Sequence, residues 1–127
     1  KIASNTKNFK DIKEYTHYSH SKNPLCGDEI HIKLVINDRK IIDFGYQGKS
    51  CIYCQATASI LSNKLVNYKT FKINELCDYA KSYFLENQKN LSKEWKFLSK
   101  LLSQKNASRQ ECILLPFNAL KKIVSDL

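Results

Sequence analysis

The sequence predicts an α+β fold in which a small antiparallel sheet is covered on one side by helices. Two segments with period-two alternation, Glu29–Asn37 and Lys40–Gln47, predict strands, and segments with helical spacing follow after Gly48. Strands that come first and helices that come later are typical of this class. A chain of 127 residues can bury one hydrophobic core, so we expect a single domain over 1–127 that opens with a short helix and a loop in 1–25.

The N-terminal part predicts a helix and then a loop. Apolar residues at three-residue steps in Asn8–Tyr18 are typical of a short amphipathic helix. The polar, turn-forming stretch Thr16–Pro24 predicts a loop. This loop would bring His17 and His20 near Cys26, where a role for the two histidines as metal ligands is an open hypothesis.

The two alternating segments predict a β-hairpin. Apolar residues alternate with His31 and its polar neighbours in the first strand, so His31 is expected to face solvent. Asn37-Asp38 is a typical turn pair. In the second strand, Ile42, Phe44 and Tyr46 are expected to share the buried face.

The rest of the chain predicts four helices. Each prediction depends on apolar residues at three- and four-residue spacing. The predicted segments are Cys51–Asn67, Lys72–Leu85, Leu91–Leu102 and a final helix from Ile113 to Val124. Pro116 fits the first turn of the final helix, where a missing backbone N–H leaves no hydrogen bond unmade. The polar stretch Gln104–Arg109 predicts a loop.

The charge pattern argues against nucleic acid as a partner. The formal net charge of +9 comes from 21 lysines and arginines against 12 acidic residues, but only Arg39 and Arg109 are arginines. Arginine is the residue that grips phosphates and guanine edges bidentately. The lysines are spread along the whole chain, which is typical of a solvated surface. A basic, zinc-stabilised nucleic-acid-binding module is therefore only a remote alternative.

The sequence also predicts the compartment. No apolar run approaches the ~18 residues that a membrane span needs, so we expect a soluble protein without a membrane partner. The lysine-rich start lacks the apolar core of a signal peptide, which indicates the cytoplasm. Five cysteines, an odd number, in such a chain favour thiol or metal chemistry over a disulfide framework.

Two of the cysteines fit the core. Cys77 lies on the apolar side of a predicted helix, as a buried small residue would. Cys54 follows Cys51 in a CxxC pattern, but no second CxxC exists to complete a zinc ribbon. We interpret Cys54 as a buried residue, with a CxxC thiol oxidoreductase as the alternative.

The other three cysteines stand at predicted element boundaries. Cys26 precedes the first strand, Cys51 begins a helix and Cys112 enters the last one. Helix N-termini stabilise thiolates through free N–H groups and the helix dipole. Asp28 reaches the same point as Cys26 if Gly27 allows a tight turn. Three thiolates and one carboxylate form a tetrahedral set that suits zinc.

Three segments resemble the U-type iron–sulfur scaffold family, which includes IscU and the N-terminal domain of NifU. Asn23–Ile36 (NPLCGDEIHIKLVI) resembles the family's NPxCGD segment, and Gly48–Leu61 (GKSCIYCQATASIL) resembles its second-cysteine motif. Arg109–Leu120 (RQECILLPFNAL) resembles the RxxCxxLxWxAL ending of the SufU branch. No LPPVK segment occurs, and Glu111 holds the position of the histidine that precedes the third cysteine in IscU. The resemblance is therefore to the SufU branch.

The resemblance implies a SufU/IscU-like domain with a zinc site made by Cys26, Asp28, Cys51 and Cys112. It also implies a sulfurtransferase-like role, in which persulfide sulfur is accepted from a pyridoxal-phosphate-dependent, SufS-like cysteine desulfurase. Downstream iron–sulfur or thiol acceptor proteins would then receive the sulfur. Cys26 is the predicted acceptor, and Cys112 is the rival because the IscU branch uses its third cysteine. Arg109 would offset part of the site's negative charge by hydrogen bonding.

An alternative within the family is a scaffold that assembles a transient [2Fe–2S] cluster on Cys26, Cys51 and Cys112. This is a carrier function and not catalysis. His17-Tyr18 resembles the family's N-terminal HY motif but lies closer to the NPLCGD segment than usual. The sequence leaves open whether zinc or a cluster is the working cofactor.

Overall fold

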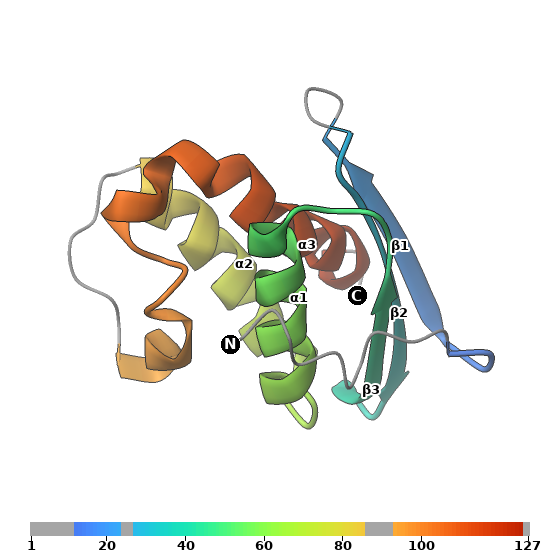
Figure 1. Ribbon diagram of the computed structural model, residues 1–127. Helices are drawn as coiled ribbons and strands as arrows, with labels where there is room; N and C mark the ends of the chain where they lie inside the picture. The colour runs from blue at the N-terminus through green and yellow to red at the C-terminus, as the bar shows by residue number, and fades with distance from the viewer. Residues whose placement is uncertain (1–11, 24–26, 86–92, 126–127) are drawn as a thin grey trace.

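A computed structural model describes residues 12–23, 27–85 and 93–125 of the chain (Figure 1). The described part is a three-stranded antiparallel sheet with helices on one face only, which confirms the predicted fold class (Figure 1). Helices α1 and α3 contact the sheet, and α2 packs on α3. The strands are β1 (His17–Lys22), β2 (Glu29–Asn37) and β3 (Lys40–Gln47), and the α-helices are α1 (Ile52–Lys64), α2 (Thr70–Leu85) and α3 (Gln110–Val124).

Strand β1 replaces the predicted N-terminal helix and loop over the described residues. Residues 12–16 are not helical, 17–22 form an edge strand paired with β2, and residues 8–11 of the predicted helix lie outside the described part. Ser19 and Ser21 occupy the buried positions of this strand. The prediction was wrong because small hydroxyl side chains fill the positions where a strand pattern normally shows apolar ones.

The predicted hairpin of β2 and β3 is confirmed, with one local error. Asp38 and Arg39 both have positive φ angles, 53° and 61°, as the two-residue turns favoured in hairpins require. The pairing of β2 with β3 then shifts register, so Ile41 is buried and Ile42 is 47% exposed. Ile42 therefore does not share the face of Phe44, because the irregularity changes the alternation of the strand.

Helices α1 and α2 confirm two predictions to within three residues at each end. The final helix α3 begins at Gln110, so Pro116 lies inside it and not in the first turn as predicted. The predicted helix Leu91–Leu102 is shorter where it is described: 93–98 form a 3₁₀ helix, η2, with non-helical angles at Trp95. Among the described residues, no helix is both long and apolar enough to cross a bilayer.

The predicted loop Gln104–Arg109 is also a 3₁₀ helix, η3, which leads directly into α3. The core lies between the sheet and the helices. Its largest fully buried side chains come from both layers: Phe44, Phe117, Ile30, Ile32, Leu34, Ile41, Leu61, Leu65, Ile73, Leu76, Leu98 and Leu102. This core positions the starts of α1 and α3 against the start of β2.

Candidate metal centre

Three of the four predicted zinc ligands lie together. One carboxylate oxygen of Asp28 and the sulfurs of Cys51 and Cys112 are all within 4.8 Å of one another. We call these three residues the thiol–carboxylate cluster. Cys26, the fourth predicted ligand, lies outside the described residues. The described part of the chain thus brings together residues from β2's start, α1's start and α3.

Cys51 is held in place by the connection between β3 and α1. It is the N-cap residue of α1, with φ −72° and ψ 170°. Gly48 precedes it with a φ of +143°, and a Cβ at this position would lie 2.3 Å from the carbonyl oxygen of Glu29. The backbone N–H of Glu29 donates to Lys49 O at 2.8 Å. Only glycine allows this close approach of the connection to β2, beside Asp28.

Cys112 is the third residue of α3, whose N-cap is Arg109. Both thiols of the thiol–carboxylate cluster therefore lie at helix N-termini, as predicted, where the dipole favours a thiolate or an anion. Pro116 has no N–H to donate to the carbonyl of Cys112, four residues before it.

The donor atoms of the thiol–carboxylate cluster repel one another's negative charge. Burial, the Cys51 thiol and then the Asp28 carboxylate raise the pKa of Cys112 well above its usual range. A site that crowds three acidic donors in this way holds protons unless a cation replaces them. Thiolate and carboxylate donors are ligands that zinc accepts, so the residues present fit this metal.

Asp28 is positioned by a tight turn. Gly27 has a φ of +78°, which confirms that glycine permits the turn. The Gly27 N–H donates to Asn23 O, and the Asn23 N–H donates to Asp28 O, both at 2.8 Å. These bonds tie together the two ends of the segment that contains Cys26.

The structure gives Arg109 a different contact from the predicted one. Its guanidinium carbon lies 5.7 Å from the ring centroid of Tyr53, a cation–π contact at the start of α1. Its role in offsetting the charge of the cluster stays a prediction. Glu111 accepts a hydrogen bond from Asn23 Nδ2 at 3.4 Å. An open depression of about 360 Å³ lies beside this contact, lined by residues of β1's end and α3.

Cys54 and Cys77 are buried, which confirms their predicted place in the core. Cys54 lies within α1 with no exposed surface. Burial raises the pKa of the Cys77 thiol to about 12. Such thiols are poor nucleophiles near neutral pH.

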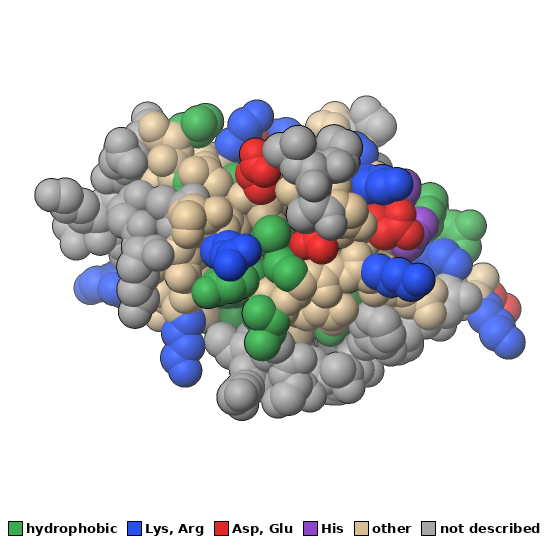
Figure 2. All heavy atoms as spheres, turned by 45° about the horizontal axis from the view of Figure 1, so that its top comes forward, with side chains coloured by type: hydrophobic (Ala, Val, Ile, Leu, Met, Phe, Trp, Pro, Cys, Tyr) green, Lys and Arg blue, Asp and Glu red, His purple; other side chains and the backbone are tan. Residues whose placement is uncertain are grey.

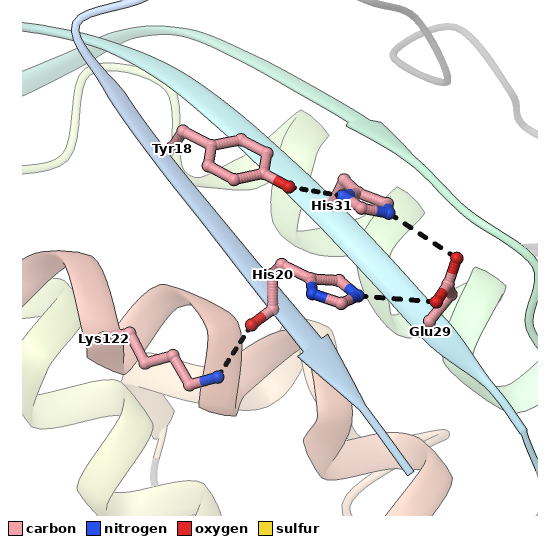
Figure 3. Close-up of polar contacts among 5 residues, drawn as sticks. All are labelled: Tyr18, His20, Glu29, His31 and Lys122. Carbon is pink, nitrogen blue, oxygen red and sulfur yellow. Dashed lines mark hydrogen bonds and ion pairs between the residues drawn. The ribbon is translucent and has the colours of Figure 1, made fainter. Parts of the chain in front are cut away.

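A second group of ligand-type residues was missed at the sequence level. His20, Glu29 and His31 lie on the face of the sheet opposite the helices, with donor atoms within 4.8 Å of one another (Figure 3). We call them the imidazole cluster. His20 was expected in a loop beside Cys26 and lies instead on β1, whereas His31 lies on the outer face of the sheet, as expected, with 35% of its side chain exposed. The sequence pattern did not predict that β1 pairs with β2. This pairing places the two histidines opposite each other.

The surface charge is mixed on the face shown in Figure 2. Lysine and arginine side chains are interspersed there with aspartate and glutamate, and histidine lies beside acidic side chains at one edge (Figure 2). A nucleic-acid-binding groove needs a continuous basic track. The described basic side chains of this face do not form one.

Comparisons with known proteins agree with the predicted fold class. The chain aligns with the IscU iron–sulfur cluster assembly scaffold protein of Thermotoga maritima at 25% identity, over 98% of this chain and 88% of the relative. It aligns with the IscU of Streptococcus pyogenes serotype M1 at 27% identity, over 80% of this chain and 65% of the relative.

Two solved structures share the fold. A SufU scaffold protein of Fervidobacterium islandicum AW-1 superimposes with a TM-score of 0.85 at 20% identity, covering 97% of this chain and 90% of that one. A NifU-like N-terminal protein of Brucella abortus gives a TM-score of 0.85 at 19% identity, covering 98% and 87%. The family model described as the NifU-like N terminal domain matches residues 3–82, which include Asp28, Cys51 and the predicted ligand Cys26. The chain therefore belongs to the family of NifU-like N-terminal domains.

Proposed function

We propose that this member of the iron–sulfur scaffold family accepts persulfide sulfur from a pyridoxal-phosphate-dependent cysteine desulfurase. The acceptor site is a zinc centre made by Cys26, Asp28, Cys51 and Cys112. The observation that carries this proposal is the thiol–carboxylate cluster, in which two thiols at helix N-termini and one carboxylate lie within 4.8 Å of one another. The curated relatives, named as scaffold proteins of iron–sulfur cluster assembly, support the same process.

Zinc suits this site because it has no redox chemistry and holds thiols as protected thiolates. With three thiolates and one carboxylate, the formal charge of the loaded site would be about −2. The residues of this chain supply the rest: Cys51 and Cys112 lie at helix N-termini, where a metal-bound thiolate is favoured, and Asp28 is the ligand with the lowest affinity for soft metals. The described donors fit the metal because they have the right chemistry and lie close together.

In the proposed transfer, the Cys26 thiolate attacks the outer sulfur of the desulfurase persulfide. A new sulfur–sulfur bond forms on Cys26, and the bond between the two sulfurs of the desulfurase breaks. The electron pair leaves with the desulfurase cysteine as a thiolate, so no external oxidant or reductant is needed. Cys112 is the rival acceptor.

A desulfurase assay with and without this protein tests the proposal. Cys26→Ala should abolish both stimulation of the desulfurase and transfer of radiolabelled sulfur. Cys54→Ala is the matched control, because it removes a cysteine of the same chain that is buried outside the cluster. A Cys26→Ala protein that still accepts label, with Cys112→Ala inactive, would assign the sulfur to Cys112 instead. Loss of activity in Cys54→Ala would favour the CxxC oxidoreductase.

A second candidate is a scaffold for a [2Fe–2S] cluster on the three cysteines, which the names of the curated relatives favour. Metal analysis of the purified protein, followed by anaerobic reconstitution with iron and sulfide, separates the two. Zinc that stays bound through reconstitution supports sulfur transfer. A stable cluster that displaces zinc supports the scaffold.

A further inference from the structure

The imidazole cluster lies on the face of the sheet that no described helix covers (Figure 3). The Glu29 carboxylate lies beside the Nε2 edges of both rings: its Oε2 is 3.5 Å from Nε2 of His20, and its Oε1 is 3.6 Å from Nε2 of His31. All three side chains are 34–39% exposed. The cluster is thus accessible to an ion from solvent.

The strand register builds this cluster. His20 on β1 and His31 on β2 are direct cross-strand partners, so their side chains leave the sheet on the same face. Glu29 is two residues before His31 and shares that face because side chains alternate along a strand. The two rings lie nearly parallel, at 10°, with centroids 4.3 Å apart. Three ligand-type side chains are therefore gathered by backbone pairing and not by flexible loops.

The ring nitrogens are arranged as metal ligands need them. Tyr18 Oη lies 2.6 Å from Nδ1 of His31, a hydrogen bond that positions this ring (Figure 3). When Nδ1–H donates to the phenol oxygen, Nε2 keeps its lone pair and points to Glu29. Nε2 of His20 is shielded from solvent and faces Glu29 Oε2 at 3.5 Å. A ligating histidine with its second nitrogen held by a partner is the usual arrangement in metal sites.

We propose that His20, Glu29 and His31 form a second metal site, which binds a divalent first-row transition-metal ion. Two imidazoles and one carboxylate leave open positions for water, a set that suits Fe²⁺ and also Zn²⁺ or Co²⁺. Metal–nitrogen distances of about 2.0–2.1 Å require the donor atoms, now within 4.8 Å, to converge. The half-exposed side chains can do this by small rotations. The site contains no sulfur and does not depend on the function proposed above.

The alternative reading of the same contacts is a purely ionic cluster, in which Glu29 pairs with imidazoles and no metal binds. The hydrogen bonds and charges of His20 and His31, acting against desolvation, lower the pKa of the Glu29 carboxyl. The two interpretations predict different numbers of bound metal ions. Only a second metal site would bind one more equivalent of metal ion than the thiol–carboxylate cluster binds alone.

Calorimetric titration of the whole chain tests the proposal. The protein is first given one equivalent of Zn²⁺ to occupy the thiol–carboxylate cluster, and Co²⁺ is then added. We expect a second equivalent to bind without thiolate-to-cobalt charge-transfer absorption, and paramagnetic broadening of the His20 and His31 imidazole resonances. In His31→Gln the second event should weaken by at least about 100-fold, and in Tyr18→Phe by about 10-fold.

His17→Gln is the matched control, because His17 lies on β1 but outside the cluster. Its second binding event should equal that of the wild type. Absence of a second event in the wild type, or equal loss in His17→Gln and His31→Gln, would overturn the proposal. If circular dichroism shows that His31→Gln is unfolded, two other results test the proposal. These are the weaker second binding event in Tyr18→Phe and the broadening of the wild-type imidazole resonances. Cys51→Ser should keep the second event, so the result is independent of the thiol site.

Discussion

At the scale of single residues, Asp28 and Glu29 show how neighbouring residues at the start of one strand contribute to clusters on opposite faces of the sheet. They are neighbours in the chain, yet Asp28 belongs to the thiol–carboxylate cluster and Glu29 to the imidazole cluster. Successive side chains at the start of β2 point to opposite faces of the sheet, so the helix side receives one carboxylate and the outer side the other. An insertion or deletion of one residue here would exchange the two carboxylates.

If the proposed zinc centre is correct, Asp28→Ala should weaken zinc retention by about 10-fold or more, because the proposed tetrahedral set would lose its one oxygen ligand. Competition with a chromogenic chelator measures the effect. Asp78→Ala is the matched control, since Asp78 is exposed on α2 and pairs with Lys121 Nζ at 2.9 Å. Equal zinc retention in the wild type and Asp28→Ala would reduce Asp28 to a turn residue.

Gly48→Ala should lower the free energy of unfolding by about 2 kcal/mol or more, from a strained φ and a clash with the Glu29 carbonyl. Gly27→Ala is the control: its φ of +78° is also strained, but no atom lies within 4 Å of the added Cβ. We therefore expect a loss of only about 1 kcal/mol there. Urea denaturation measures both, and equal losses would mean that the contact with β2 is unimportant.

Cys77 should resist alkylation in the folded protein. With the pKa of its thiol at about 12, only roughly one molecule in ten thousand carries the thiolate at pH 8. The more accessible Cys51 is the internal reference. Mass spectrometry after iodoacetamide treatment of the native, metal-free protein should find label on Cys51 and not on Cys77. Label on Cys77 at a similar rate would contradict its placement in a closed core.

At the scale of elements, the helices and the hairpin were predictable and the edge strand was not. The hairpin shows apolar alternation, and α1 and α2 show helical spacing, so local pattern suffices. Strand β1 has serines at its buried positions and depends on its partner β2 for its conformation. Lys122 Nζ also donates a hydrogen bond to His20 O at 2.7 Å, which joins α3 to β1 although the two residues are far apart in the sequence (Figure 3). Contacts between residues so far apart in the sequence cannot be predicted from a local sequence pattern.

Ser21→Ala should stabilise the protein by about 1 kcal/mol. The Ser21 hydroxyl is buried without a hydrogen-bond partner among the described residues, and so is that of Ser19. Replacing an unsatisfied hydroxyl with hydrogen removes a desolvation cost at little loss of packing. Ser62→Ala is the control, because its buried hydroxyl already donates to Ser59 O at 2.9 Å. Thermal and urea unfolding should show a gain for Ser21→Ala and none for Ser62→Ala.

At the scale of the whole molecule, the sequence motifs predicted the thiol–carboxylate cluster, but not the imidazole cluster. Asp28, Cys51 and Cys112 each carry a local signal, a turn or a helix start, and the fold then brings them together. His20 and His31 carry no signal of their own, because their proximity arises only from the pairing of β1 with β2. Sites that depend on pairing between strands need the three-dimensional structure.

Metal removal should lower the melting temperature of the whole domain. An ion that binds only the folded state at 100 times its dissociation constant adds about 2.7 kcal/mol of stability. The described residues of the proposed centre come from the start of β2, from the start of α1 and from α3, so an ion bound there would link the sheet to two helices. Calorimetry with and without a chelator measures the shift. Cys51→Ser should show a much smaller shift, and an unchanged shift would place the stabilising ion elsewhere.

The positions of the ligands along the chain also have a consequence for biosynthesis. Asp28 and Cys51 leave the ribosome early, whereas Cys112 follows only after α2 and both 3₁₀ segments have been made. Until then, a nascent chain offers an incomplete ligand set, whose affinity for an ion is lower. At the proposed centre, the full ligand set is thus available only after α3 has been synthesised. A chain truncated before residue 112 would lack one proposed ligand and, with it, part of the stability that a bound ion adds to the folded state.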